Sequence, residues 1–182
     1  MKRFLSLLFC VLAVAACKTH QSADSITEAD EQFMREAIRL SVESVAHGGG
    51  PFGAVIVKDG KIIAARSNSV TIDNDPTAHA EVNAIRQACR QLGTFDLDDC
   101  VIYTSCEPCP MCLGAIYWAG IDRIYYANTR QDAEKIDFDD NFIYEELSRP
   151  LSERDIPFIQ LLRDEAQAAF KAWTEKDDRK EY

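Results

Sequence analysis

The chain has 182 residues, of which 47% are hydrophobic and 27% are charged, a composition typical of one globular domain and not of a disordered chain. Its 20 basic and 30 acidic residues give a net charge of −10. This charge argues against partners that are recognised through their phosphates, such as DNA, tRNA or an anionic lipid surface, but it allows a small neutral substrate.

The N-terminal segment resembles an export signal. A basic start precedes an apolar stretch over residues 4–16, which is too short to span a bilayer, since that takes ~20 apolar residues. Its ending resembles a lipoprotein box, in which Cys17 would become the lipidated first residue. We therefore expect a signal peptide over residues 1–16, a tether over residues 17–26, and a membrane-anchored, extracytoplasmic lipoprotein that meets the membrane only through its N-terminal lipid. The alternative is a wrongly assigned start codon in front of a cytoplasmic protein.

A helix and a hairpin are predicted next. Apolar residues recur at helical spacing over residues 27–46, and Thr27 and Asp30 have the spacing of a capping box. Apolar runs over residues 52–57 and 61–65 flank an Asp-Gly turn. This pattern is typical of a β-hairpin.

The rest of the chain alternates helical and extended patterns. Thr77 or Asp75 is expected to cap the first of these helices. The first predicted helix starts at residue 76 or 78 and runs to about residue 92. The other predicted helices cover residues 108–119, 141–147 and 164–174, and the predicted strands cover residues 100–104, 121–126 and 156–162. With the hairpin, these elements predict an α/β fold, a three-layer α/β/α sandwich around a mixed five-stranded sheet, in one domain over residues 27–182.

Two short segments carry the residues of a metal site. Cys109 and Cys112 are three residues apart at a predicted helix start, so their side chains share one face and the helix dipole favours their thiolates. With His79 they supply three ligands for one zinc ion per chain. The fourth tetrahedral position would hold water, as in catalytic zinc sites.

Glu81 follows His79 by two residues. The two side chains are about 200° apart around a helix, so we expect Glu81 beside the bound water and not on the metal. There its carboxylate can take a proton from the water and return it later. The sequence leaves two other interpretations of the Cys109 and Cys112 pair open. It could be a redox pair, or half of a structural zinc site that Cys106 and Cys100 complete.

H-x-E followed by P-C-x-x-C is the signature of zinc deaminases. The sequence around it resembles the cytidine and deoxycytidylate deaminase superfamily, and its later segments resemble the small zinc-dependent guanine deaminases of bacteria. The segments that carry the first resemblance are residues 52–57, 74–81 and 103–112, and those that carry the second are residues 113–119, 138–144 and 180–182. The resemblance implies a cytidine deaminase-like fold over residues 27–182.

The resemblance further implies hydrolysis of guanine to xanthine and ammonia, with a small purine base and no nucleic acid as the partner. Glu81 would shuttle protons, and Asp140 would contact the substrate and assist proton transfer. Asn68 would hydrogen bond the purine. Tyr182 would close the pocket from a C-terminal segment exchanged with a second subunit, which implies a homodimer. Two further candidates could pack against the base, namely Trp118 and Phe52.

Other functions remain possible on the sequence alone. The substrate could be another purine or a nucleoside, such as guanosine or a tRNA adenosine, although the acidic chain disfavours tRNA. A non-catalytic zinc-binding lipoprotein is the other alternative. Glu81 argues against it, because a structural zinc site has no use for that carboxylate.

Overall fold

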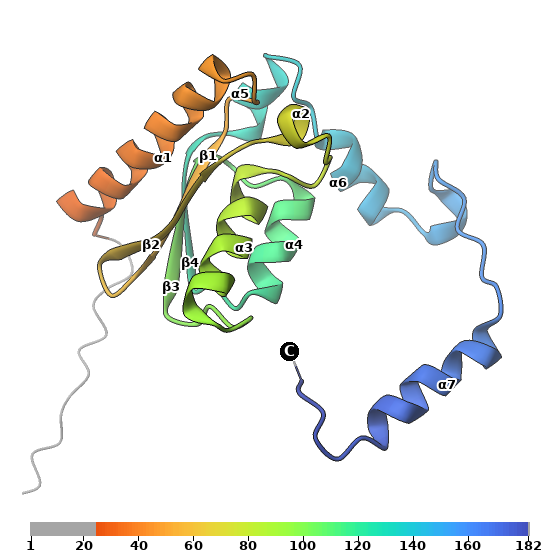
Figure 1. Cartoon of the computed structure of the whole chain (residues 1–182). Helices are drawn as coiled ribbons and strands as arrows, with labels where there is room; N and C mark the ends of the chain where they lie inside the picture. The colour runs from red at the N-terminus through yellow and green to blue at the C-terminus, as the bar shows by residue number, and fades with distance from the viewer. Residues whose placement is uncertain (1–24, 182) are drawn as a thin grey trace, which may run out of the picture.

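The computed structural model describes residues 25–181. The expected signal peptide, Cys17 and Tyr182 therefore lie outside the described residues. Helices and strands alternate along the chain after an N-terminal helix and a hairpin (Figure 1). In chain order they are α1 (Glu28–Ala46), β1 (Gly53–Lys58), β2 (Lys61–Ser67), α2 (Val70–Asp73), α3 (Ala80–Leu92), β3 (Cys100–Cys106), α4 (Pro110–Trp118), β4 (Arg123–Asn128), α5 (Arg130–Glu134), α6 (Asn141–Ser148), the 3-10 helix η1 (Leu151–Glu153) and α7 (Arg163–Thr174).

The sheet is mixed, and its strand order is β2-β1-β3-β4. β1 runs antiparallel to both β2 and β3, whereas β3 and β4 are parallel. The α/β class is as predicted, but the expected fifth strand is wrong. Residues 156–162 form neither helix nor strand and are all exposed. Their backbone meets no sheet edge within residues 25–181, and a strand forms only where its N–H and C=O groups are paired.

Helices cover both faces of the sheet: α1 lies on one face, and α3 and α4 lie side by side on the other (Figure 1). Ala80, Ala84 and Ala88 face the sheet from α3 and are completely buried. Because these side chains are small, the helix backbone lies close to β2 and β1. The position of α3, and of the residues at its N-terminus, is therefore fixed by backbone packing.

The predicted capping box begins α1. Thr27 Oγ1 accepts from the Asp30 backbone N–H, while the Asp30 carboxylate accepts from the Thr27 backbone N–H. Asp30 also accepts a hydrogen bond of 2.5 Å from the hydroxyl of Tyr103 on β3. Farther along, Gly53 at the start of β1 meets α1 so closely that an added Cβ would lie 2.3 Å from the carbonyl oxygen of Ala37. These contacts hold α1 against the sheet.

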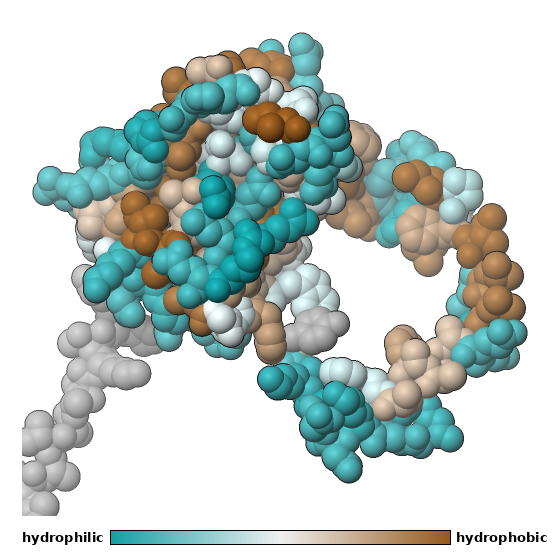
Figure 2. Space-filling view, viewed as in Figure 1, coloured by the Kyte–Doolittle hydropathy of each residue, from teal (hydrophilic) through white to brown (hydrophobic). Residues whose placement is uncertain are grey.

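Residues 155–181 form the C-terminal arm, which includes α7. Every residue of the arm is exposed, and Phe170 and Trp173 of α7 line a shallow pocket together with Trp118 of α4. Figure 2 shows hydrophobic side chains along the chain between α6 and α7. Among the most exposed are Ile156, Ile159 and Leu161, at 75%, 85% and 78%. Apolar groups left this exposed are typical of a surface that another chain covers.

Candidate active site

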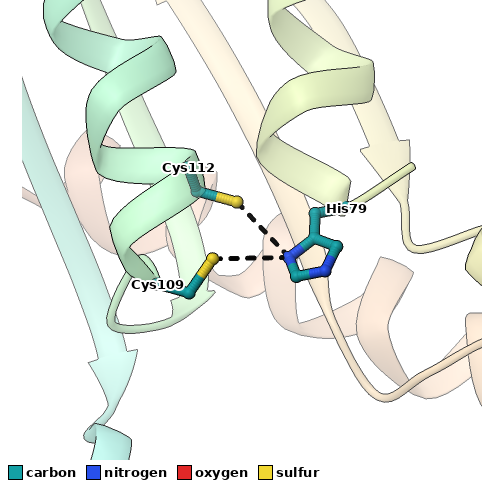
Figure 3. Close-up of side chains that lie close together, drawn as sticks. All are labelled: His79, Cys109 and Cys112. Atoms are coloured by element: carbon teal, nitrogen blue, oxygen red, sulfur yellow. Dashed lines mark hydrogen bonds between the residues drawn. The ribbon is translucent and has the colours of Figure 1, made fainter. Parts of the chain in front are cut away.

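The predicted metal ligands meet where the N-termini of α3 and α4 lie side by side (Figure 3). α3 begins later than expected, because Asp75 accepts two hydrogen bonds from Thr77 and closes a turn before the helix. His79 is therefore the N-cap of α3, in an extended conformation with φ −69° and ψ 154°. Cys109 is the N-cap of α4 in a similar conformation, and Cys112 lies in the first turn.

The three ligand atoms are spaced as zinc requires. His79 Nδ1 lies 3.6 Å from Cys109 Sγ and 3.5 Å from Cys112 Sγ (Figure 3), and all three atoms fall within 4.8 Å of one another. In a tetrahedral site with Zn–S of about 2.3 Å and Zn–N of about 2.05 Å, a sulfur and a nitrogen ligand are about 3.5 Å apart. The donor set and its geometry therefore fit one zinc ion.

The two sulfurs differ in protonation. The adjacent Cys112 thiol and His79 lower the pKa of Cys109 to about 4, although burial opposes this shift. The same contact with Cys109, together with burial, raises the pKa of Cys112. Zinc ligation requires both thiolates, so a proton held on Cys112 would be released when the metal binds.

Glu81 lies beside this ligand set and is itself 5% exposed. The hydroxyl of Thr104 on β3 donates a hydrogen bond of 2.8 Å to Glu81 Oε1, and Cys112 Sγ lies 3.4 Å from Oε2. Burial raises the pKa of Glu81, while the hydrogen bond from Thr104 acts in the opposite direction. A buried carboxylate held next to a metal site is arranged for proton transfer.

A cavity of about 380 Å³ opens over these residues. That volume is at the small end of the range typical of small-molecule sites. Its wall combines apolar side chains with several carboxylates and one guanidinium. The apolar members are Phe52, Pro76, Met111, Ala133, Phe138 and Ile143, and the carboxylates are Glu81, Glu107, Asp137, Asp139 and Asp140.

Two of the predicted substrate contacts lie in this wall. Phe52 packs edge-on against Phe138, with ring centroids 5.0 Å apart and an interplanar angle of 86°. Asp140 is half-buried just before α6, and burial raises the pKa of its carboxyl. Its neighbour Asp139 is exposed and accepts a hydrogen bond from the backbone N–H of Asn141. The Asp140 carboxyl is therefore less accessible to solvent in the folded protein than the Asp139 carboxyl.

The other predicted contacts lie elsewhere. Asn68 is buried and does not line this cavity; its side-chain oxygen accepts from the backbone N–H groups of Gly50 and Val70, both at 3.2 Å. Trp118 is 71% exposed at the C-terminal end of α4 and lines a separate pocket with Trp173. Within one chain, the structure therefore does not bring Trp118 to the cavity. Tyr182 lies outside the described residues.

Several residues of the site were not identified from the sequence. Thr104 gives no signal of its role in the sequence, because threonine is common in β-strands of any kind. Glu107 reaches the cavity from the loop after β3, and Arg130 reaches it from the first turn of α5. Glu107 Oε2 accepts a hydrogen bond from the backbone N–H of Arg130. The parallel pairing of β3 and β4 brings these two segments together, and no local pattern reveals it.

Residues 27–128 match the sequence family described as the cytidine and deoxycytidylate deaminase zinc-binding region. This match includes the three metal ligands and Glu81. The chain therefore belongs to this family of zinc-binding deaminases.

Within the family, the chain is similar to the guanine deaminase of Bacillus subtilis, with 57% identity over 153 residues that cover 84% of this chain and 98% of the relative. The solved structure of guanine deaminase from that organism has 55% identity and a TM-score of 0.82, covering 86% of this chain and 99% of the other. A guanine deaminase structure from Nitrosomonas europaea has 33% identity and a TM-score of 0.61, covering 81% and 86%. The tRNA-specific adenosine deaminase of Aquifex aeolicus is 42% identical over 97 residues, covering 53% of this chain and 64% of that protein.

These matches overturn the predicted localisation as a membrane-anchored lipoprotein. The Bacillus subtilis relative is covered almost completely by 153 residues of this chain, so it has no counterpart of the N-terminal apolar stretch. No helix formed by residues 25–181 has the length and apolar character needed to cross a bilayer. The predicted lipidation of Cys17 lies outside the described residues.

Proposed function

We propose that the protein is a zinc-dependent guanine deaminase that converts guanine and water to xanthine and ammonia, in one deaminase domain over residues 27–182. The observation that carries this proposal is the placement of Glu81 beside the three zinc ligands, on the wall of a cavity of about 380 Å³. The similarity to guanine deaminases over nearly their whole length supports guanine as the substrate.

Zinc held by His79, Cys109 and Cys112 would supply an activated water, because binding to zinc lowers the pKa of water to about 7. Glu81 takes one proton from the attacking water and delivers it to N3 of the purine ring, where it stays in xanthine. It then transfers the second water proton to the amine, which leaves as ammonia. Thr104 holds Glu81 in place for both transfers. The C2–N bond of guanine breaks, a C2–O bond forms, and ammonia leaves.

Asp140 is positioned to orient the substrate and to assist the transfer. Guanine presents N–H donors at N1 and at its C2 amine, and carboxylates are the acceptors that suit such donors. Asp140 lies on the cavity wall with Glu81, so two carboxylates can accept from this edge. Phe52 and Phe138 form an apolar wall that packs against the flat base and excludes water.

Asn68 is proposed to donate to an acceptor atom of the purine. Its side-chain oxygen is already held by two backbone N–H groups, which fixes the amide in one orientation. The amide NH₂ group of Asn68 donates to no residue in the described part of the chain. The backbone N–H of Asn68 donates to the carbonyl of Phe52, which links it to the cavity wall.

We further propose a homodimer in which the C-terminal arms are exchanged. Every residue of the arm is exposed, many of them are apolar, and β4 leaves its outer edge unpaired among residues 25–181. Residues 156–162 of one subunit would add the missing fifth strand beside the partner's β4. Tyr182 would then close the partner's cavity, and Trp118 would contribute to the surface on which the arm packs.

The proposed function is tested by measuring xanthine and ammonia formation by the zinc-loaded protein, with guanine, guanosine, adenine and cytidine compared side by side. We expect turnover of guanine alone. Glu81→Gln should retain one zinc per chain and lose turnover. Activity on a nucleoside without activity on guanine would refute the substrate, and unchanged turnover by Glu81→Gln would refute the mechanism.

A further inference from the structure

The cavity is strongly acidic but contains one guanidinium. Five carboxylates line it, and Arg130 is the one lysine or arginine of residues 25–181 that lines it. Arg130 is the first residue of α5, shortly after β4, and is half-buried. Neither the zinc site nor the proton transfers described above uses this side chain.

The guanidinium of Arg130 is held in place without an ion pair. It lies over the ring of Tyr144 on α6, 4.8 Å from the ring centroid, in a cation–π contact. The hydroxyl of Tyr144 donates to the carbonyl oxygen of Pro108, which precedes the zinc ligand Cys109. The backbone N–H of Arg130 is held by Glu107. These contacts fix Arg130 relative to the metal site.

The hydrogen-bonding groups of Arg130 are nevertheless unused. No side chain or carbonyl within residues 25–181 accepts from its guanidinium, although this group has five N–H donors and several carboxylates line the same cavity. A fixed, half-buried cation with free donors is arranged to bind a ligand that carries acceptors.

Guanine carries such acceptors on the side away from its N–H donors. O6 and N7 lie on one edge of the purine, and a guanidinium binds both at once through two parallel hydrogen bonds. The opposite, C2 side carries donors that suit Glu81 and Asp140. Guanine could thus present its donors to the carboxylates and its acceptors to Arg130 in a single orientation.

We propose that Arg130 is a specificity-determining residue that donates to the O6 and N7 acceptors of guanine. This inference rests on the proposed function. It explains how an acidic cavity distinguishes guanine from purines with an amino group or hydrogen at C6, because such purines leave at least one guanidinium donor without an acceptor.

The test compares guanine with 2-aminopurine, which keeps the C2 amine and N7 but lacks O6. 2-Aminopurine is fluorescent, so its binding is measured directly, and the binding of guanine is measured by displacement, whether or not either compound is turned over. The variants are Arg130→Met, which removes the hydrogen-bond donors, and Arg130→Lys, which keeps the positive charge but lacks the two parallel N–H donors of the guanidinium. Arg35→Met on α1 is the matched control, since Arg35 pairs with Glu31 on an exposed helix face.

We expect Arg130→Met to weaken guanine binding and to lower kcat/KM for guanine about 10- to 100-fold, while 2-aminopurine binding changes less than about threefold. Arg130→Lys should recover only part of the guanine preference, and Arg35→Met should change neither ligand. An equal loss of binding for both ligands would mean that Arg130 only supports Tyr144, and this would overturn the inference. Unchanged binding of both ligands would overturn it as well.

The two proposals fail separately. If the wild-type protein forms no xanthine but Arg130→Met still loses guanine binding selectively, the proposed reaction fails and the recognition stands. If guanine is deaminated and the variant keeps its preference for guanine over 2-aminopurine, the recognition fails and the reaction stands.

Discussion

The hydroxyl of Thr104 donates a hydrogen bond of 2.8 Å to Oε1 of Glu81, and both side chains are buried. Thr104 belongs to β3, in the middle of the sheet, whereas Glu81 is in the first turn of α3. This contact ties the Glu81 carboxylate to an internal strand of the sheet. Of the two carboxylate oxygens, Oε2 is left facing the zinc ligands.

Thr104→Val keeps the shape of this side chain and removes its donor. We expect kcat for guanine to fall about 10-fold or more, since hydrogen bonds to a charged group are worth roughly 1.5–3 kcal/mol, while zinc content stays the same. Steady-state kinetics and metal analysis check this. Thr71→Val is the matched control, because its hydroxyl bonds the carbonyl of Gly48 on the exposed surface. Wild-type kcat in Thr104→Val would show that Glu81 needs no such support.

The cysteines near the site should divide into ligands and non-ligands. Cys109→Ser should lose zinc, because serine replaces a thiolate ligand. Cys106→Ser should keep one zinc per chain: burial raises the pKa of Cys106 to about 11, and its thiol donates to the carbonyl of Thr129. Metal analysis after dialysis against a weak chelator distinguishes the two. Loss of zinc from Cys106→Ser would place this residue in the ligand set.

Gly53→Ala should destabilise the protein by about 2 kcal/mol, because an added Cβ would meet the Ala37 carbonyl oxygen at 2.3 Å and the Ser41 nitrogen at 2.7 Å. The control is Gly114→Ala in α4, where nothing lies within 4 Å of an added Cβ, and alanine favours the helix. Urea unfolding gives both free energies. Equal stability of the two variants would mean that α1 shifts to make room at no cost.

Tyr103→Phe should lower stability in a pH-dependent manner. Burial raises the pKa of Asp30, but hydrogen bonds from Thr27 and Tyr103 outweigh this, so the net pKa lies below its usual 3.8. A carboxyl with a lowered pKa stabilises the fold above its unfolded pKa, and this stabilisation is lost as the pH falls through the folded value.

We therefore expect Tyr103→Phe to be less stable than wild type by about 1 kcal/mol at pH 7, and this difference to shrink below about pH 4. Urea unfolding at several pH values measures it. Tyr126→Phe, which alters an exposed tyrosine on β4, should match wild type throughout. A difference between wild type and Tyr103→Phe that stays constant down to pH 3 would contradict the role of Asp30.

The exchanged arm is tested in the full-length chain. The double variant Ile159→Asp and Leu161→Asp puts two charges on the most exposed apolar part of the arm. Light scattering should then report a monomer that keeps its zinc but loses at least about 10-fold in guanine turnover, because the proposed contact of the partner's Tyr182 with the cavity would be lost. Gln160→Asp adds one charge at a polar position between them and should remain a dimer. A double variant that stays dimeric, or a wild-type monomer, would refute the exchange.

The metal ligands could be predicted from the sequence because their chemistry fixes both residue type and spacing. Cys109 and Cys112 must share one helical face, and H-x-E separates a ligand from its neighbouring carboxylate. The hairpin and α1 were predictable for a similar reason, since turn and capping residues act on close neighbours.

Other features depend on contacts between distant segments, so local pattern could not reveal them. A fifth strand was expected at residues 156–162 from their apolar character, but strand formation also needs an edge to pair with. Arg130 gives no signal of its own, because it becomes part of the cavity only when β4 pairs with β3. The start of α3 shifted because the turn between Asp75 and Thr77 competes with the helix.

The buried alanines of α3 have a consequence for metal uptake. Because Ala80, Ala84 and Ala88 fix the helix backbone against the sheet, His79 is held in place by folding itself. The conformational entropy of bringing His79 to the two cysteines is then lost before any ion arrives. Zinc would meet a preorganised set of donors, and its binding should proceed with little change in secondary structure.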